Sequence, residues 1–160
     1  MPVRHLDLIS HWRLSAPAEQ VWAALTDPEV WPQWWPNVRS VRTLRCAGAD
    51  GLGSVRRVEW ATGLFGVVVI DVEAIESQRL ERLRGRWTGA LRGDGIWLLR
   101  AEAGFTDVTA VWRIELVKRW MRWLAPVLTP LFRRSHSGVM RAGCAGLVRH
   151  LATGSALPKG

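Results

Sequence analysis

The fold prediction starts from residues 12–36, WRLSAPAEQVWAALTDPEVWPQWWP. This stretch predicts the end of a strand, a short helix with Pro17 in its first turn, and a second short helix. Asp27 and Pro28 provide the cap and first position of that second helix, and Pro36 ends it. Five of the 11 Trp of the chain lie here, more than a small core needs. Beside a curved-sheet pattern, so many Trp indicate the wall of an apolar cavity.

Beyond this stretch, apolar and polar residues alternate in segments that are separated by turn signals. This pattern predicts an antiparallel meander, with a first strand that precedes the short helices. The predicted strands cover residues 4–14, 38–46, 53–60, 66–76, 80–91, 96–103 and 108–115.

The sequence Arg92-Gly-Asp-Gly95 is predicted to be a hairpin turn between the fifth and sixth strands. Two registers stay open for this hairpin. One places Trp87 on the same face as Ile96, and the other places Trp97 on the same face as Arg86. The choice matters because a slip of one residue moves every side chain of a strand to the other face.

The C-terminal part of the chain is predicted to be helical, with a short turn over 120–125 and a long helix over 130–151. Thr129-Pro130 provides a cap and a proline for the start of the long helix. At 1.5 Å per residue, this helix would be about 33 Å long, enough to cross a sheet. Small residues over 142–146 would let it lie close to the strands. A cavity is expected where the curved sheet wraps around the helix without packing fully against it.

Length and composition predict one domain over residues 1–152 and a flexible tail over 153–160. Cys46 and Cys144 have no Cys or His neighbour at zinc-ligand spacing, so we expect free thiols and a reducing compartment. The sequence has no signal-peptide pattern and no apolar run of membrane-spanning length. We therefore expect a cytoplasmic protein without stable membrane insertion.

The formal net charge is +8, and almost all of the basic residues are Arg. Such a balance is compatible with nucleic acid or an anionic membrane surface as a partner. Because the Arg residues are scattered along the chain, we interpret them as a solvated basic surface and expect no nucleic-acid binding.

The order of the predicted elements resembles the START/Bet v 1-like (SRPBCC) superfamily, in particular bacterial polyketide cyclase/dehydrase and lipid-transport-like proteins. The resemblance covers about residues 6–151. It is carried by residues 16–22, 27–36, 38, 83–87, 95–98, 109–112, 140–143 and 147. It implies an α+β helix-grip fold: a seven-stranded curved antiparallel sheet around a long C-terminal helix, with two short helices after strand 1. It also implies a ligand cavity that carriers, cyclases and regulators share, so it does not choose an activity.

A search for catalytic patterns assigns no catalytic residue. The chain has no nucleotide-binding loop, no HExxH motif and no GxSxG motif, and its four His have no metal-ligand spacing. No metal or cofactor is expected. In cyclase-like relatives, a polar residue inside the cavity orients a polyketide and assists aldol condensation and dehydration. Arg56 and Arg86 are compatible with either face of their strands.

The candidate cavity residues are mostly Trp, because an indole offers a broad apolar face and one N–H donor. Trp22, Trp31 and Trp112 are also compatible with plain core packing, and which Trp face the cavity is left open. The candidates are Trp34, Trp35, Trp60, Trp87, Trp97, Trp112, Val139 and Met140.

Three functions are compatible with this pattern. The leading hypothesis is the binding of a small hydrophobic or amphipathic ligand, such as a lipid, polyketide or aromatic metabolite, between the sheet and the last helix. The alternative is a polyketide cyclase or aromatase that acts in the same cavity. The third is a protein-interaction module, which an exposed patch around Trp120, Trp123 and Leu124 would support. We expect a monomer or a weak homodimer.

Overall fold

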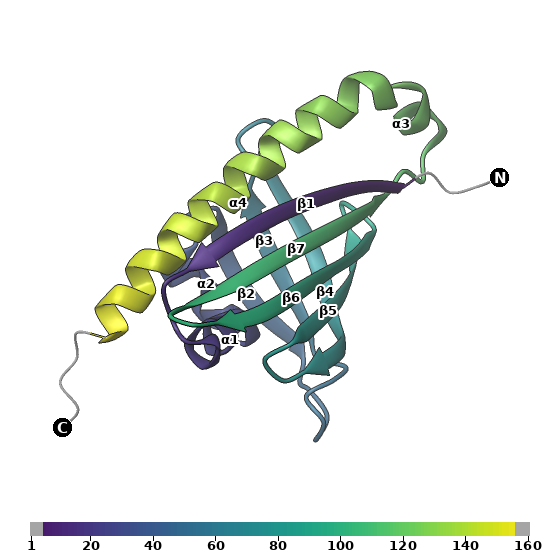
Figure 1. The fold of residues 1–160 in the computed structure, drawn as a ribbon. Coiled ribbons are helices and arrows are strands. Elements are labelled where there is room, and N and C mark those ends of the chain that lie inside the picture. The colour runs from purple at the N-terminus through teal and green to yellow at the C-terminus, as the bar shows by residue number, and fades with distance from the viewer. Residues whose placement is uncertain (1–4, 156–160) are drawn as a thin grey trace.

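The computed structural model describes residues 5–155 and shows a curved sheet with one long helix lying along it (Figure 1). Two short α-helices and a 3₁₀ helix follow the first strand, and another short α-helix precedes the long C-terminal helix. The elements are β1 (His5–Leu14), α1 (Ala18–Thr26), η1 (Pro28–Val30), α2 (Trp31–Trp34), β2 (Val38–Arg45), β3 (Val55–Ala61), β4 (Val67–Gln78), β5 (Arg82–Gly89), β6 (Gly93–Glu102), β7 (Phe105–Glu115), α3 (Arg119–Trp123) and α4 (Ala125–Ser155).

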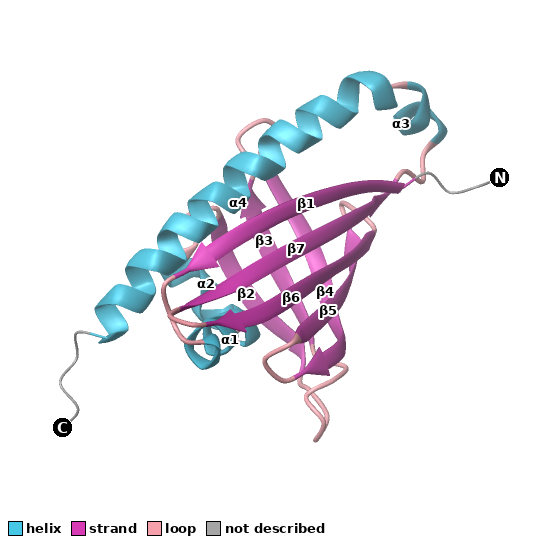
Figure 2. Cartoon of the chain, viewed as in Figure 1, coloured by secondary structure: helices cyan, strands magenta, loops and turns pink. Residues whose placement is uncertain are grey.

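All seven strands belong to one antiparallel sheet, in the order β1-β7-β6-β5-β4-β3-β2 (Figure 2). Strands β2 to β7 follow one another as a meander, and β1 pairs with β7 over its full length, from His5 opposite Glu115 to Leu14 opposite Thr106. The predicted α+β helix-grip fold with a seven-stranded sheet is therefore confirmed. Arg4, the predicted first residue of β1, lies outside the described residues.

The predicted hairpin turn at 92–95 is wrong, and so are both of its registers. Residues 90–92 connect the strands, and Gly93 and Gly95 already lie in β6. Gly93 is opposite Trp87, and Trp97 is opposite Leu83. Trp87 and Trp97 therefore lie on the same face of the sheet. Gly95 serves packing here, because a Cβ at this position would lie 2.4 Å from the Trp87 ring.

Helix α4 begins earlier and ends later than predicted. It starts at Ala125, so Pro130 lies inside the helix and is not its first residue. At 1.5 Å per residue, its 31 residues span about 46 Å. Residues 153–155, which were expected in the tail, are helical, and 156–160 lie outside the described residues. None of the helices in the described part of the chain is long and apolar enough to cross a membrane.

The small residues of α4 face α2 and the residues that follow it, whereas we expected them to face the strands. A Cβ at Gly146 would lie 1.7 Å from the Trp34 carbonyl oxygen, and a Cβ at Gly143 would lie 2.4 Å from the Trp35 ring. The Trp35 indole Nε1 donates a hydrogen bond to the Val139 carbonyl at 2.9 Å. The main core lies between these helices and the inner face of the sheet.

This packing makes the two glycines of α4 at 146 and 138 a matched pair. Gly146→Ala should lower the free energy of unfolding by about 1–3 kcal/mol, because the added methyl group collides with backbone. Gly138→Ala has open space around its Cβ and should raise the free energy of unfolding by about 0.5–1 kcal/mol, as Ala replaces Gly within a helix. Urea denaturation measures both. Equal effects of the two substitutions would contradict the close approach of α4 to Trp34.

Candidate functional site

A cavity of about 420 Å³ lies against the inner face of the sheet. Its walls come from strands β3 to β7, from the first turns after β1, and from the loop that joins β2 to β3. Exposed residues at its rim, Thr26, Ala47, Gly51 and Ser77, mark its mouth between α1 and this loop. The lining residues are Trp22, Leu25, Thr26, Pro28, Trp31, Ala47, Gly51, Ser54, Arg56, Val58, Trp60, Ile70, Val72, Ala74, Glu76, Ser77, Leu83, Arg84, Gly85, Trp87, Gly95, Trp97 and Trp112.

The cavity lies in a different place from the one expected. Each lining residue comes from the sheet, from the helices after β1 or from the β2–β3 loop, and none comes from α4. Helix α4 instead packs tightly over α2, where the Trp34–Trp35 segment fills the space between helix and sheet. The indole rings therefore occupy the volume where we expected the cavity.

Six Trp line the cavity, and they include four of the predicted residues. Trp60, Trp87, Trp97 and Trp112 lie on its walls. The other two lining Trp are Trp22 and Trp31. The remaining candidates, Trp34, Trp35, Val139 and Met140, are buried in the core between α2 and α4 and do not line the cavity.

Trp22 and Trp31 were missed because they were equally compatible with the core. Along α1 the buried residues are Ala18, Val21 and Leu25, and Trp22 lies beside this stripe and is only half-buried. A bulky aromatic residue next to the buried face of a short helix was the signal for a cavity wall. Trp31 is fixed by its own indole, whose Nε1 donates to the Ala24 carbonyl at 3.1 Å.

Strand β3 places an arginine in the apolar wall. Ser54, Arg56, Val58 and Trp60 alternate toward the cavity, and all four line it. The Arg56 Nη1 atom donates to the Ser54 hydroxyl at 2.9 Å. The Arg56 Nε atom is buried and has no hydrogen-bond partner, and the buried Nε1 of Trp60 has none either. Buried donors are normally paired, so these two N–H groups are exceptions in the packing behind the cavity wall.

The other charged groups of the lining already have partners. Arg84 pairs with Asp94 at 3.1 Å, and Glu76 pairs with Arg82 at 3.3 Å. On the outer face of β3, Arg57 pairs with Asp71 at 2.8 Å. Among the described residues, Arg56 is the lining arginine without a carboxylate partner.

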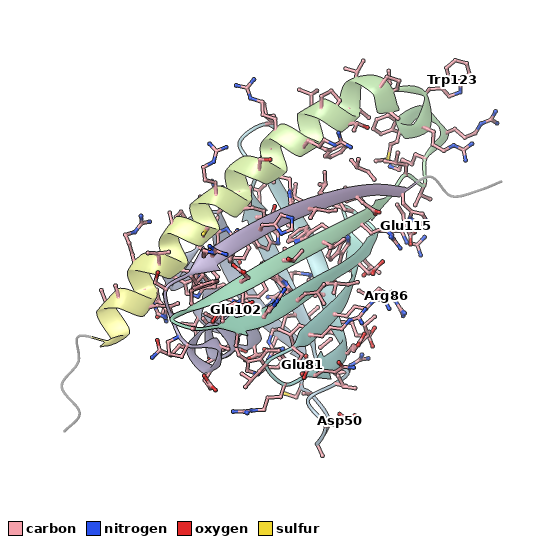
Figure 3. All side chains as sticks on the ribbon, in the orientation of Figure 1. Asp50, Glu81, Arg86, Glu102, Glu115 and Trp123 are labelled. Atoms are coloured by element: carbon pink, nitrogen blue, oxygen red, sulfur yellow. The ribbon has the colours of Figure 1, made fainter. Side chains whose placement is uncertain are left out.

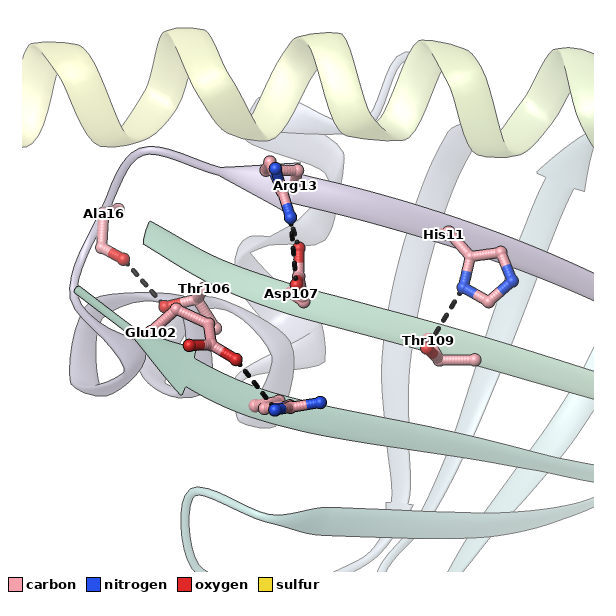
Figure 4. A network of polar contacts seen from close by, with 8 residues as sticks. His11, Arg13, Ala16, Glu102, Thr106, Asp107 and Thr109 are labelled. Atoms are coloured by element: carbon pink, nitrogen blue, oxygen red, sulfur yellow. Dashed lines mark hydrogen bonds and ion pairs between the residues drawn. The ribbon is translucent and has the colours of Figure 1, made fainter. Parts of the chain in front are cut away.

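A second hollow, of about 540 Å³, lies over β1, β6 and β7. Figure 4 shows the polar contacts that cross it and its surroundings, including His11 with Thr109 and Arg13 with Asp107. Four of its nine lining side chains are exposed, and Arg13 is already paired with Asp107 at 3.1 Å. One Trp lines this hollow and six line the first, so the Trp-lined cavity is the better candidate site.

His136 of α4 packs against the cavity wall from outside. Its imidazole lies edge-on to Trp112, with 5.2 Å between the ring centroids. Burial lowers the pKa of His136 to about 4, because the charged form loses its hydration. This is a helix-packing histidine, one of the two roles expected for the histidines of this chain.

Neither cysteine belongs to a metal site. Cys46 is exposed, Cys144 is half-buried, and both are free thiols. Burial raises the pKa of the Cys144 thiol. Within residues 5–155, no three His, Cys, Asp or Glu side chains lie close enough together to hold a metal ion.

Comparison with known proteins assigns the chain to a family. It belongs to the family described as "Polyketide cyclase / dehydrase and lipid transport", whose sequence profile matches residues 11–152. The expected resemblance to polyketide cyclase/dehydrase and lipid-transport proteins is thereby confirmed. No curated protein matches the chain significantly.

Solved structures of similar fold include a START superfamily protein and two aromatase/cyclases. A START superfamily protein from Mycobacterium smegmatis has a TM-score of 0.73 and 13% identity, covering 92% of this chain and 98% of that one. The Zhui aromatase/cyclase from Streptomyces sp. R1128 has a TM-score of 0.73 and 14% identity, covering 92% and 96%. The di-domain aromatase/cyclase BexL, from the BE-7585A biosynthetic pathway, has a TM-score of 0.72 and 21% identity, covering 93% of this chain and 50% of BexL. At these identities the likeness shows the fold alone.

The burial of His136 predicts a specific acid sensitivity. An imidazole with a pKa of about 4 when folded and about 6.5 when unfolded binds its proton more readily in the unfolded chain. Stability should therefore fall as the pH is lowered from about 6.5 to 4, by at most about 3 kcal/mol. His136→Phe should flatten this part of the curve in urea denaturation at several pH values.

The control removes an imidazole from the surface. His11→Phe, on the exposed face of β1, should leave the acid-dependent loss as in the unmodified protein. Arginine partners lower the pKa values of Asp7 and Asp71, so these carboxylates lose their contribution only below about pH 4 and stay outside the window. A His136→Phe curve that still falls between pH 6.5 and 4 as in the unmodified protein would contradict the burial of this group.

Proposed function

We propose that the chain binds a small amphipathic molecule in the Trp-lined cavity, with an apolar body against the indoles and an oxygen-bearing group on Arg56. The observation that carries this proposal is a cavity walled by six Trp, with Arg56 in its lining and no carboxylate paired with that arginine among the described residues. Family membership supports it, since the family description includes lipid transport.

The apolar part of the ligand is set by the shape and composition of the walls. A volume of about 420 Å³ lies within the range of pockets that enclose small organic ligands. The ring of Trp112 contacts those of Trp60 and Trp87, with centroids 5.7 and 4.9 Å apart, so the three rings form a continuous aromatic surface. Flat aromatic or polycyclic bodies gain more from such a surface than a flexible chain does, because they lose less conformational entropy on binding.

The polar part of the ligand is set by strand β3. Arg56 and Trp60 are four residues apart on the same face of β3, so their backbone positions lie about 13 Å apart along the strand. Arg56 has a hydroxyl partner but no carboxylate, so its charge favours a carboxylate, an enolate or a strongly polarised carbonyl.

Cyclisation of a poly-β-ketone is the second candidate function. A poly-β-ketone carries an oxygen on every second carbon, which suits a wall with spaced donors. In an intramolecular aldol condensation, a methylene carbon adds to a carbonyl carbon of the same chain and water leaves. A guanidinium such as that of Arg56 stabilises the enolate oxygen that forms on the way. Two of the proteins with similar folds carry the name aromatase/cyclase, which supports this reading.

Ligand binding is tested with a matched pair of acidic and neutral compounds. An aromatic carboxylic acid should quench Trp fluorescence and raise the melting temperature. Arg56→Met should weaken its binding about tenfold or more, because a charge-assisted hydrogen bond is lost. The affinity for the corresponding alcohol should fall much less on the same substitution. Arg39→Met, at an exposed position of β2 away from the cavity, is the control and should change neither affinity.

A second pair of variants tests which hollow is used. Ala74→Trp places a large ring into the cavity and should abolish the binding of both compounds. Leu98→Trp fills the hollow on the outer face and should leave binding intact. Binding that survives Ala74→Trp in a folded protein, or that is lost only with Leu98→Trp, would overturn the proposed site.

Turnover separates the two candidate functions. An enzyme should change the distribution of cyclised products from a synthetic poly-β-ketone thioester, as followed by liquid chromatography and mass spectrometry. Arg56→Met should shift this distribution back toward that of the spontaneous reaction. If the protein binds the compound and the products match those without protein, the cavity serves binding alone.

A further inference from the structure

The basic residues of this chain are spread along it, but the acidic residues are not. Residues 1–115 hold 14 arginines and all 14 acidic residues, so this part has no net formal charge. Residues 116–160 hold the other eight basic residues and no acidic one. The basic residues are therefore scattered as expected, but the net charge is not, and the whole +8 belongs to residues 116–160, which include α3 and α4.

Large apolar side chains are exposed on the same segment. Trp123 is 82% exposed and Trp120 is 54% exposed, whereas each of the other nine Trp is buried or half-buried. Leu124, Val127 and Leu131 continue the apolar surface into the first turns of α4. We name this surface, with its basic neighbours Lys118, Arg119, Arg122, Arg133 and Arg134, the elbow surface.

The basic side chains of the elbow surface are uncompensated. Within the part of the chain that the structure describes, no ion pair involves any of these five residues. Four of them are exposed and Arg122 is half-buried. Exposed Trp and aliphatic residues between unpaired cations are a costly surface in water, which indicates that a partner covers it.

The chemistry of this surface identifies the partner. We propose that the elbow surface docks on an anionic phospholipid bilayer, with Trp123 and Leu124 in the interfacial region and the basic side chains on the lipid phosphates. Trp is the side chain that favours the membrane–water interface, and Lys and Arg flank it in surface-bound helices. Nucleic acid is the weaker reading, because exposed Leu and Val gain nothing from a phosphate backbone. A second copy is disfavoured because it would bring two uniformly basic surfaces together.

The elbow surface lies away from the mouth of the cavity. Figure 3 shows Trp123 at one end of the molecule and Asp50, at the tip of the β2–β3 loop, at the other. That loop contributes Ala47 and Gly51 to the rim of the cavity. Docking therefore leaves the mouth accessible, and ligand binding and membrane binding can be measured independently.

Co-sedimentation with vesicles tests the proposal. The full chain should sediment with phosphatidylcholine vesicles that contain phosphatidylglycerol, weakly or not at all with phosphatidylcholine alone, and less as salt is raised. Each basic residue near an anionic surface strengthens binding about fivefold, so Arg119→Glu with Arg122→Glu should weaken it at least tenfold. Trp123→Ala should weaken it several-fold at unchanged net charge.

The control for charge is Arg39→Glu with Arg79→Glu, which changes the net charge equally at exposed positions of β2 and the β4–β5 turn. It should keep most of the binding. An equal loss with this control, equal binding to neutral vesicles, or displacement from vesicles by nucleic acid at low concentration would each overturn the proposal. Absence of sedimentation with anionic vesicles at low salt would do so too, and an acidic protein would then be the partner to seek.

The same variants separate this proposal from the function of the cavity. In the variant with Arg119→Glu and Arg122→Glu, the aromatic acid should quench Trp fluorescence as it does in the unmodified protein. The melting temperature of the variant shows whether it is folded. Loss of vesicle binding with retained ligand binding supports a docking surface independent of the cavity. Joint loss of both in a folded variant would contradict the separation of elbow surface and mouth.

Discussion

The position of α4 and the shape of the cavity both depend on the side chain of Trp35. Its ring is fully buried, and its Nε1 donates to the Val139 carbonyl of α4 at 2.9 Å. Were the helix displaced, this N–H would be left unpaired in the core, which costs on the order of 1–3 kcal/mol. On α4, the residue that faces the Trp35 ring is Gly143, and any Cβ at this position would collide with the ring. One hydrogen bond and one missing side chain together fix how the last helix lies on the molecule.

Trp35 also supports the cavity from behind. Its ring contacts those of Trp60 and Trp97, with centroids 4.8 and 6.1 Å apart, and both of these line the cavity. The wall therefore rests on a packed aromatic layer that the helix closes from the other side. Because close-packed protein interiors have low compressibility, we expect the cavity to keep its shape without a ligand. For the proposed ligand, such a preformed wall would favour a rigid body, and Arg56 would be the residue of the lining that selects for an acidic group.

The sequence was sufficient for the fold because several independent signals agree on it. Prolines and Asp27 mark the ends of the helices after β1, and the alternation of apolar and polar residues marks each strand. The hairpin between β5 and β6 failed because Gly93 and Gly95 have a packing role, which sequence alone does not distinguish from a turn. The start of α4 failed because Pro130 is tolerated inside the helix.

The site was only partly predictable, for a geometric reason. Alternation tells which residues of a strand share a face, so Trp60 in the wall already implied that Arg56 points the same way, and this signal was available. Alternation does not tell how far α4 stands from the sheet. That distance decides whether Trp34 and Trp35 line a cavity or fill it, and it depends on contacts more than a hundred residues apart, such as Trp35 with Val139. The excess of basic residues over 116–160 was equally visible in the sequence, but only when the positions of the acidic residues are compared with those of the basic ones. Residues 1–115, which include the whole sheet, have no net formal charge, and residues 116–160 carry all of it, so the proposed ligand site and the proposed docking surface depend on different parts of the chain.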